Sequence, residues 1–342
     1  MSDELGSGPD GRGGGGRRGW SPDEVPDLAG RRALVTGATG PTGREVVLTL
    51  ARHGAEVVVA DRDLDQLAAL VRTVDADEQV QRRGTARPVA LRLDLADLDS
   101  VRDGAEEVGR QVSDQVGGAA LDLLVLDEGH RDRSASTTAD GFDAALAARF
   151  LGPFALVGRL LPLLTAARSG RVVTVVSPTH KLARELSADD LAGGAHGALE
   201  RRTAWAAPAE AALAGLLLAL ELDRRARDQR VGSLRSVAAL AGLDASSALD
   251  QADGLRQRVR RGPSILQAAL GAVEQRSALA PWPVLMAATA DLPGGTVVGP
   301  GGPLGLNGGA RIVNPPRTAR DRELRAQLWT QAEEATDVRY LS

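Results

Sequence analysis

Short apolar runs alternate along most of the chain with longer stretches in which apolar residues recur every three or four positions. Runs such as LDLLVL and RVVTVV are typical of parallel strands buried on both faces, and the periodic stretches are typical of amphipathic helices. The alternation predicts an α/β fold, a doubly wound parallel sheet wrapped by helices. The predicted strands are Ala33–Thr36, Glu56–Ala60, Pro88–Arg92, Asp122–Leu126, Arg171–Val176 and Arg235–Leu240. Helices are predicted to begin near Gly43, Leu64, Leu98, Ala139 and Pro208, and a last helix covers Asp321–Ala335.

The chain departs from this alternation in three places. Residues 1–26 are rich in glycine and arginine and contain few apolar residues, which predicts a disordered tail before a single domain over 27–342. Within that domain, residues 243–278 are predicted to form a small helical insertion over the carboxyl edge of the sheet. Residues 293–309 are rich in glycine and are predicted to form an irregular loop.

Composition narrows the class of protein. Hydrophobic residues make up 43% and charged residues 25%, which is ordinary for a globular protein. The net charge of −4 argues against a nucleic-acid partner. No cysteine occurs, and none of the four histidines has a second one at metal-binding spacing, so no metal site is expected. Ala211–Leu220, interpreted as the longest apolar segment, is too short to span a bilayer, so a cytoplasmic protein without membrane contact is expected.

A glycine-rich turn joins the first predicted strand to the first helix. Its glycines, Gly37, Gly40 and Gly43, would let the backbone approach a pyrophosphate and direct the helix N-terminus at its charge, as in a Rossmann-type fold. Asp61 ends the second strand, where a carboxylate accepts hydrogen bonds from a ribose and repels a 2′-phosphate. NAD is therefore favoured, and neighbouring Arg62 leaves NADP possible. The alternative is a glycine turn kept only for packing.

With these motifs the chain, from about Asp27 to Val338, resembles the short-chain dehydrogenase/reductase family, particularly its retinol-dehydrogenase-like branch. Segments that carry the likeness, besides the glycine turn, are LDLADL at 93–98, TADGF at 138–142, LELDRR at 220–225, AATA at 287–290, the Gly-Pro pairs near 299–303 and LW at 328–329. The resemblance implies that Asp94 contacts adenine. The residues then expected to bind the cofactor are Gly37, Thr39, Gly40, Gly43, Asp61, Arg62, Asp94, Leu95 and Gly129.

The family's chemistry, as the resemblance implies it, uses a tyrosine, a lysine, a serine and an asparagine. The serine is kept as Ser177, after the strand RVVTVV. Arg149 falls at the asparagine position. Pro208 and Ala212 fall at the tyrosine and lysine positions.

The absence of the tyrosine and lysine pair is also evident from the residue counts, without any alignment. The only tyrosine is Tyr340 and the only lysine is Lys181, so no Tyr-x-x-x-Lys pair can be written anywhere. A phenol without a nearby cation is a poor acid at neutral pH, which excludes the family's standard proton transfer. The first hypothesis is an NAD(P)-binding oxidoreductase homologue that is non-catalytic or regulatory. The alternative is an NAD(P)-dependent oxidoreductase, or another enzyme, with altered chemistry that uses Ser177 and the His180–Lys181 loop.

Two acidic residues and one helix bear on the ligands and partners. Asp127 and Glu128 replace the family's Asn-Asn and could repel the cofactor's phosphates; adjacent residues at a strand end usually point in opposite directions, which argues against an acid/base pair. The helix over 208–225 carries small residues that, by the resemblance, would face a dimer axis. A homodimer or pairing with an active homologue is expected, with packing inside one chain as the alternative. A small-molecule ligand is possible, and the sequence identifies none.

Overall fold

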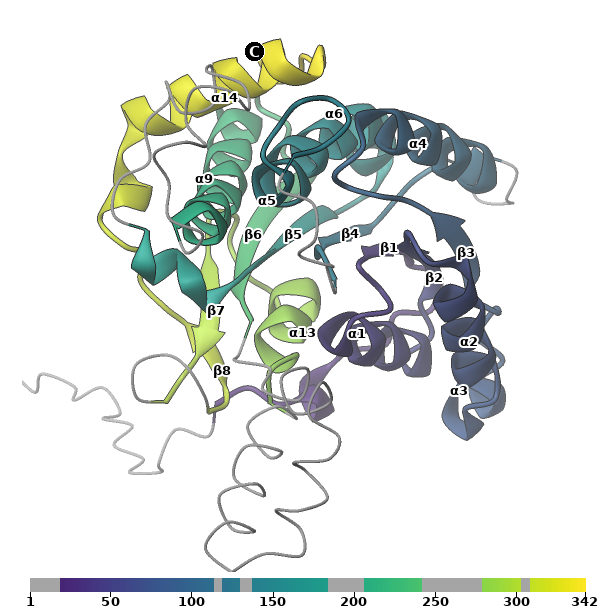
Figure 1. Cartoon of the computed structure of the whole chain (residues 1–342). Coiled ribbons are helices and arrows are strands. Elements are labelled where there is room, and N and C mark those ends of the chain that lie inside the picture. Colours follow the sequence, from purple (N-terminus) through teal and green to yellow (C-terminus); the bar gives the residue numbers. More distant parts are fainter. Residues whose placement is uncertain (1–18, 114–118, 130–136, 184–205, 242–278, 303–307) are drawn as a thin grey trace, which may run out of the picture.

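The structure, a computed structural model, describes residues 19–113, 119–129, 137–183, 206–241, 279–302 and 308–342. These residues form one sheet with helices on both faces (Figure 1). The insertion expected at 243–278 lies outside the described residues, as does most of the tail expected at 1–26.

The sheet of the described residues has the strand order β3-β2-β1-β4-β5-β6-β7-β8. Every pair is parallel except β7 and β8, which are antiparallel. The strands are β1 Arg32–Thr36, β2 Glu56–Asp61, β3 Val89–Arg92, β4 Leu123–Leu126, β5 Gly170–Val176, β6 Leu234–Leu240, β7 Val297–Pro300 and β8 Ala310–Ile312. The first six confirm the predicted strands and the doubly wound fold. The strand order reverses between β1 and β4, so their carboxyl ends flank the crevice where such sheets bind ligands.

Two apolar layers hold the helices against the sheet. Helices α1, α2, α3 and α13 pack on one face, and α4, α6 and α9 pack on the other (Figure 1). Helix α5 continues through a π-helical turn, η2, into α6. The helices are α1 Pro41–Arg52, α2 Leu64–Asp75, α3 Glu78–Arg83, α4 Leu98–Ser113, α5 Ala144–Leu146, η2 Ala147–Leu151, α6 Gly152–Ala166, α9 Ala206–Asp228, α13 Trp282–Thr289 and α14 Arg322–Thr336. Short 3₁₀ turns are η1 Pro22–Glu24, η3 Pro178–Leu182 and η6 Thr318–Arg320.

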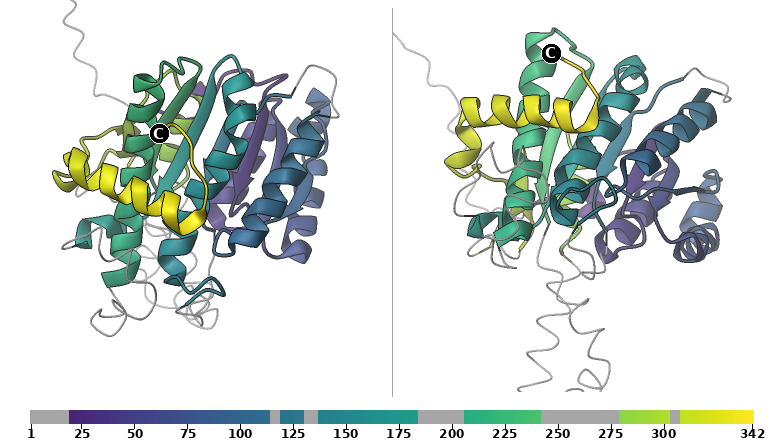
Figure 2. Two further views of the ribbon diagram at one scale, coloured as in Figure 1. Left: turned by 90° about the horizontal axis from the view of Figure 1, so that it is seen from above. Right: turned by 45° about the horizontal axis from the view of Figure 1, so that its top comes forward.

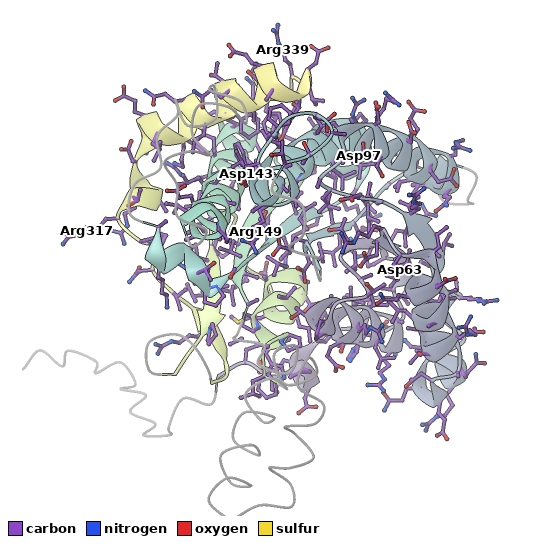
Figure 3. The ribbon with its side chains drawn as sticks, in the orientation of Figure 1. Asp63, Asp97, Asp143, Arg149, Arg317 and Arg339 are labelled. Atoms are coloured by element: carbon purple, nitrogen blue, oxygen red, sulfur yellow. The ribbon has the colours of Figure 1, made fainter. Side chains whose placement is uncertain are left out.

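The helix expected to begin near Ala139 begins at Ala144 instead. The residues before it form a turn, in which Gly141 has a φ of +84° and Thr138 N–H donates to Phe142 O at 2.8 Å. Asp143 then caps the helix, because its carboxylate accepts from the backbone N–H groups of the first turn. Figure 3 labels this aspartate beside α5. The predicted start was wrong because apolar residues also recur at helical spacing within this turn.

Both ends of the domain contain more structure than expected. Trp20 is buried, at 9% exposure, and forms a β-bridge with Ala310, so the tail expected at 1–26 is wrong for its last residues. The loop expected at 293–309 contains strand β7. Its residues 303–307 lie outside the described part of the chain. The sequence did not predict this short strand because the glycines and prolines around it are typical of loops.

One helical stretch of the described chain, Ala144–Ala166, is long and apolar enough to cross a bilayer. With 23 residues it is longer than Ala211–Leu220, so the expectation that Ala211–Leu220 is the longest apolar segment is wrong. Its most apolar 18-residue window is 72% buried inside the protein. Core helices pass the same test of length and composition, and this burial identifies the stretch as part of the apolar layer beneath the sheet.

The C-terminal segment closes the layer that contains α9. Helix α14 lies across α9 and α6 (Figure 2). Trp329 packs edge-on against Phe154 with ring centroids 4.9 Å apart, and Tyr340 packs against both rings. Gly158 makes room, because a Cβ there would meet the Tyr340 ring at 2.5 Å.

The small residues of α9 pack inside the same chain. Ala211, Ala212 and Ala214 are buried, and a Cβ on Gly215 would meet the Arg149 carbonyl oxygen at 2.9 Å. Close approach to η2 therefore accounts for these residues without a second subunit. Whether two chains associate stays a prediction.

Candidate functional site

The glycine turn after β1 is held by contact with the turn after β4. Gly37 has a φ of +57°, which favours glycine, and a Cβ on it would meet the Gly129 backbone nitrogen at 2.3 Å. Gly129 also has a positive φ, +65°, and its own Cβ would meet Gly37 Cα at 2.8 Å. Positions 37 and 129 must therefore both be glycine for the turns after β1 and β4 to come this close.

The other two glycines place the first helix. Gly40 is the N-cap of α1, and Pro41 follows at the first helical position, where its missing N–H removes no helical bond. A Cβ on Gly43 would meet Gly37 O at 2.4 Å. The packing alternative is thus sufficient to explain Gly37 and Gly43, while the exposed first turn of α1 still presents backbone N–H groups to an anion.

Asp61 is buried, and both of its carboxylate oxygens accept hydrogen bonds from neighbouring residues of the chain. Its Oδ2 accepts from the Thr39 hydroxyl at 2.6 Å and from Thr39 N–H at 3.1 Å. Its Oδ1 accepts from Arg62 N–H at 2.8 Å. The carboxylate therefore fixes the glycine turn against the end of β2. Its role as a ribose ligand stays a prediction, and a ribose hydroxyl would have to share an oxygen already in use.

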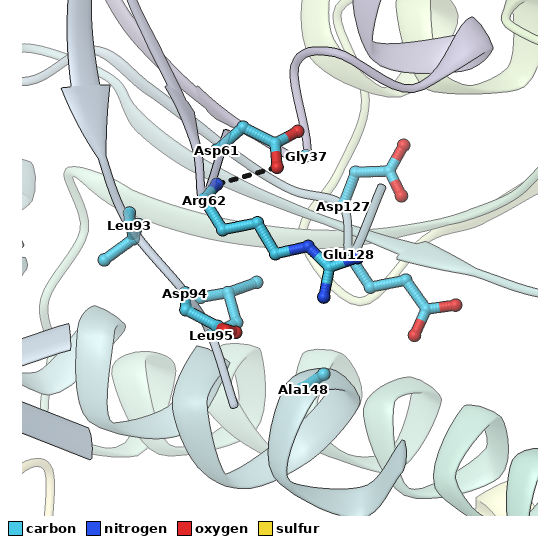
Figure 4. Close-up of a pocket in the computed structure, with 9 residues that line it drawn as sticks. All are labelled: Gly37, Asp61, Arg62, Leu93, Asp94, Leu95, Asp127, Glu128 and Ala148. Carbon is cyan, nitrogen blue, oxygen red and sulfur yellow. Dashed lines mark hydrogen bonds between the residues drawn. The ribbon is translucent and has the colours of Figure 1, made fainter. Parts of the chain in front are cut away.

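A cavity opens where β1, β2 and β4 end. Figure 4 shows Arg62 extending from the end of β2 into it. The free space is about 20 Å³, enough for about one water molecule. Five of the residues predicted to bind the cofactor meet here: Gly37, Asp61, Arg62, Asp94 and Leu95.

Asp127 and Glu128 follow strand β4, which ends at Leu126, and both line the same cavity. Their side chains extend to opposite sides in Figure 4. Thr36, which the sequence analysis missed, holds Asp127: its hydroxyl donates to Asp127 O at 2.7 Å and accepts from Asp127 N–H at 3.0 Å. The sequence feature that could have indicated this role is a threonine at the end of an otherwise apolar strand.

The charge at this edge is strongly negative. Burial, together with the charges of Glu128 and Asp61, raises the pKa of the Asp127 carboxyl from 3.8 to about 7. The Gly129 N–H, 3.1 Å from Asp127 Oδ1, and the Arg149 guanidinium act in the opposite direction. Near neutral pH this carboxyl exists in both protonation states.

Arg149 connects this edge to helix α9. The side chain comes from η2 and lies inside the molecule, whereas Arg317 and Arg339 extend from its surface (Figure 3). Its Nη2 donates to Glu128 Oε1, and its Nη1 donates to the carbonyl oxygen of Pro208 at 2.7 Å. The positions expected for the family's asparagine and tyrosine are therefore in direct contact, through an arginine and a backbone carbonyl.

The Ser177 loop brings its three candidate residues together in η3, but not as a proton relay. The Ser177 hydroxyl accepts from the Thr179 hydroxyl at 2.9 Å. His180 Nδ1 lies 2.8 Å from the Ser177 carbonyl oxygen, and since a carbonyl only accepts, Nδ1 carries the proton. Burial lowers the pKa of His180, so the ring is neutral at neutral pH. Lys181 is exposed.

Tyr340 lies elsewhere. Its hydroxyl is buried and donates to Phe154 O at 3.1 Å, among the aromatic rings beneath α14. Burial raises the pKa of this phenol well above its ordinary value of 10. The single tyrosine is thus part of the apolar core in this chain.

The residues of the cavity fit a dinucleotide in part. The glycine turn and the N-terminus of α1 suit a pyrophosphate. Glu128 Oε2 is buried without a hydrogen-bond partner among the described residues, an acceptor that a ribose hydroxyl would satisfy. The free space is too small for adenosine until the Arg62 side chain moves.

Comparisons with known proteins agree with this geometry. Residues 31–188 match the short chain dehydrogenase model. Polyprenol dehydrogenase of Mus musculus is 39% identical over 207 residues, which cover 59% of this chain and 57% of that protein. Over these residues the chain is similar to members of the short-chain dehydrogenase/reductase family. Retinol dehydrogenase 13 of Homo sapiens, 29% identical over 58% of this chain and 55% of that protein, indicates the retinol-dehydrogenase-like branch. The chain thus spans little more than half the length of these relatives.

Solved structures extend the likeness over the whole fold. A protein of Mycobacterium paratuberculosis, itself uncharacterized, matches with a TM-score of 0.72 and 29% identity over 94% of this chain and 99% of its own. The RhlG/NADP active-site complex of Pseudomonas aeruginosa matches with a TM-score of 0.52 and 20% identity, over 79% of this chain and 94% of that one. The second match concerns the fold alone.

Proposed function

We propose that this chain is a dinucleotide-binding member of its family that no longer performs the family's proton transfer and acts as a regulatory or ligand-sensing protein. One observation carries the proposal: the Arg149 guanidinium binds the carbonyl of Pro208 and the carboxylate of Glu128. These contacts occupy the positions where the resemblance expects an asparagine and a tyrosine.

The groups at those positions cannot replace a phenol. A guanidinium keeps its protons throughout the physiological pH range, and a proline side chain has none to give. The chain's one phenol, Tyr340, is bonded to Phe154 O in the core. A carbonyl substrate beside Ser177 therefore has no conventional acid to protonate its oxygen.

The cofactor we propose is NAD(H) rather than NADP(H). Four carboxylates line the cavity against a single guanidinium, that of Arg62. A 2′-phosphate would add negative charge to this group, whereas a ribose hydroxyl would donate to a carboxylate oxygen. The chain's residues would bind the pyrophosphate at the glycine turn, and when bound the nicotinamide supplies hydride-transfer chemistry.

Isothermal titration with NADH and NADPH tests the binding half of the proposal. We expect NADH to bind at least about ten times more tightly than NADPH, the effect of one unfavourable charge contact of about 1.4 kcal/mol. Gly37→Ala should abolish NADH binding, because the added Cβ meets Gly129 N. Gly30→Ala is the matched control, because Gly30 has a similar φ of +76° and open space around it. Failure of both dinucleotides to bind would refute the cofactor assignment.

Absorbance at 340 nm tests the catalytic half. The protein is mixed with NAD and long apolar alcohols, or with NADH and the matching aldehydes. The absorbance should then change no faster than it does without the protein. The names of the relatives, a polyprenol dehydrogenase and a retinol dehydrogenase, suggest these compounds. Turnover that is lost in Ser177→Ala and His180→Ala would refute the non-catalytic role and favour the altered enzyme.

A further inference from the structure

A second cavity lies away from the dinucleotide crevice, at the other end of the carboxyl edge. It is about 330 Å³ in volume and lies among η3, the end of β6, β7 and β8. The first cavity lies among β1, β2 and β4, and the two share no lining residue. A volume above about 300 Å³ is in the range of small-molecule sites in proteins.

The floor of this cavity is buried and uncharged. It includes Leu240, Gly299 and Pro300. Gly299 is essential to the space, since a Cβ on it would meet Leu240 Cδ1 at 3.3 Å and Val313 Cγ2 at 3.2 Å. His180 also lines the cavity and is buried, and its ring is neutral with the proton on Nδ1.

The exposed lining residues carry positive charge. Lys181, the only lysine of the chain, comes from η3, and Arg311 comes from β8. Among the described residues that line the cavity, there is no carboxylate. In the described part of the chain no acidic side chain lies within ion-pair distance of Arg311. The dinucleotide cavity has the opposite charge, because it is lined by four carboxylates and one guanidinium.

We propose that this second cavity binds a small apolar organic anion, a medium-chain carboxylate, with its carboxylate between Lys181 and Arg311 and its alkyl chain on the buried floor. Two cations beside an apolar recess match an amphiphile with one anionic end, and carboxylates form strong charge-assisted bonds with guanidinium and ammonium groups. The inference does not depend on dinucleotide binding.

Isothermal titration of the full chain with hexanoate, octanoate, octan-1-ol and octyltrimethylammonium tests the proposal. We expect octanoate to bind at one site and about 15 times more tightly than hexanoate, since each buried CH₂ contributes about fourfold. Octan-1-ol should bind at least about ten times more weakly than octanoate, and the cation should not bind. Equal binding of anion and cation, or no binding of octanoate, would overturn the proposal.

Variants locate the site. Arg311→Met should weaken octanoate about tenfold, the value of one charged hydrogen bond, and Val313→Phe should abolish it by filling the recess. Arg320→Met, an exposed arginine of η6 outside the cavity, is the matched control and should bind octanoate normally. Far-ultraviolet circular dichroism and the thermal unfolding midpoint show whether each variant is folded. Octanoate binding that survives both Arg311→Met and Val313→Phe would place the ligand elsewhere and refute the assignment.

Discussion

Replacing Asp127 with asparagine should stabilise the protein at pH 8 and leave it unchanged near pH 4. Burial raises the pKa of this carboxyl from 3.8 to about 7. Between these values the folded protein holds a proton that the unfolded chain has released, so the stability of the wild type falls as the pH rises through this window. Above about pH 7 both states are ionised and the loss is complete. Asparagine does not titrate and can still accept the Gly129 N–H bond.

The size of the effect follows from the shift. About three pKa units at about 1.4 kcal/mol each set a ceiling of about 4 kcal/mol. Asp127 keeps part of its surface open to solvent, so screening lowers the expected gain to about 2 kcal/mol at pH 8.

Urea denaturation of both proteins from pH 4 to pH 8.5, followed by tryptophan fluorescence, measures the difference in unfolding free energy. Asp63→Asn is the control, because Asp63 is an N-cap whose pKa is lowered, first by its bond from Gln66 N–H, and asparagine caps equally well. Its difference from wild type should be small and of opposite sign above pH 4. If the Asp127→Asn curve ran parallel to that of the wild type across this range, the carboxyl would not be perturbed and the reasoning would fail.

Three further outcomes follow from the same structure. NADH should bind more tightly at pH 6 than at pH 8, since protonation of Asp127 removes a negative charge from the cavity, and titration calorimetry of Asp127→Asn should show this dependence lost. Tyr340→Phe should lower stability by about 1 kcal/mol through one lost hydrogen bond and leave NADH binding unchanged; weaker NADH binding with unchanged stability would speak against a structural role. Gly37→Ala should lower the thermal midpoint more than Gly30→Ala, because only the former adds a backbone clash to the cost of its positive φ, and equal losses would contradict the close approach.

The fold was readable from the sequence because the strands are continuous apolar runs. RVVTVV and LDLLVL each correspond to a strand of the sheet, and the glycine turn after β1 lies where the pattern placed it. Strands β7 and β8 were missed because they are short and enclosed by glycine and proline. Their register depends on backbone pairing with neighbours distant in sequence, which a local pattern does not contain.

The sequence named candidate residues for the site but did not indicate how their side chains meet. The sequence identified Arg149, Glu128 and Pro208 as departures from the family, yet nothing in their spacing indicated that one side chain joins the other two. That contact depends on the position of η2 against α9, where Gly215 allows the backbones to approach. Likewise, the sequence predicts that Asp61 binds a ribose, but it does not indicate that the Thr39 hydroxyl donates a hydrogen bond to the same carboxylate.

The β-bridge between Trp20 and Ala310 has a practical consequence for handling the protein. Strand β8 ends the sheet, and Trp20 N–H donates to Ala310 O at 3.0 Å on its outer side, with Gly19 packed against Gly309. An uncovered edge strand is a template for pairing with another chain. Truncation beyond residue 20, for a tag or a crystallisation variant, would uncover this edge, and self-association of the shortened protein should then rise with concentration.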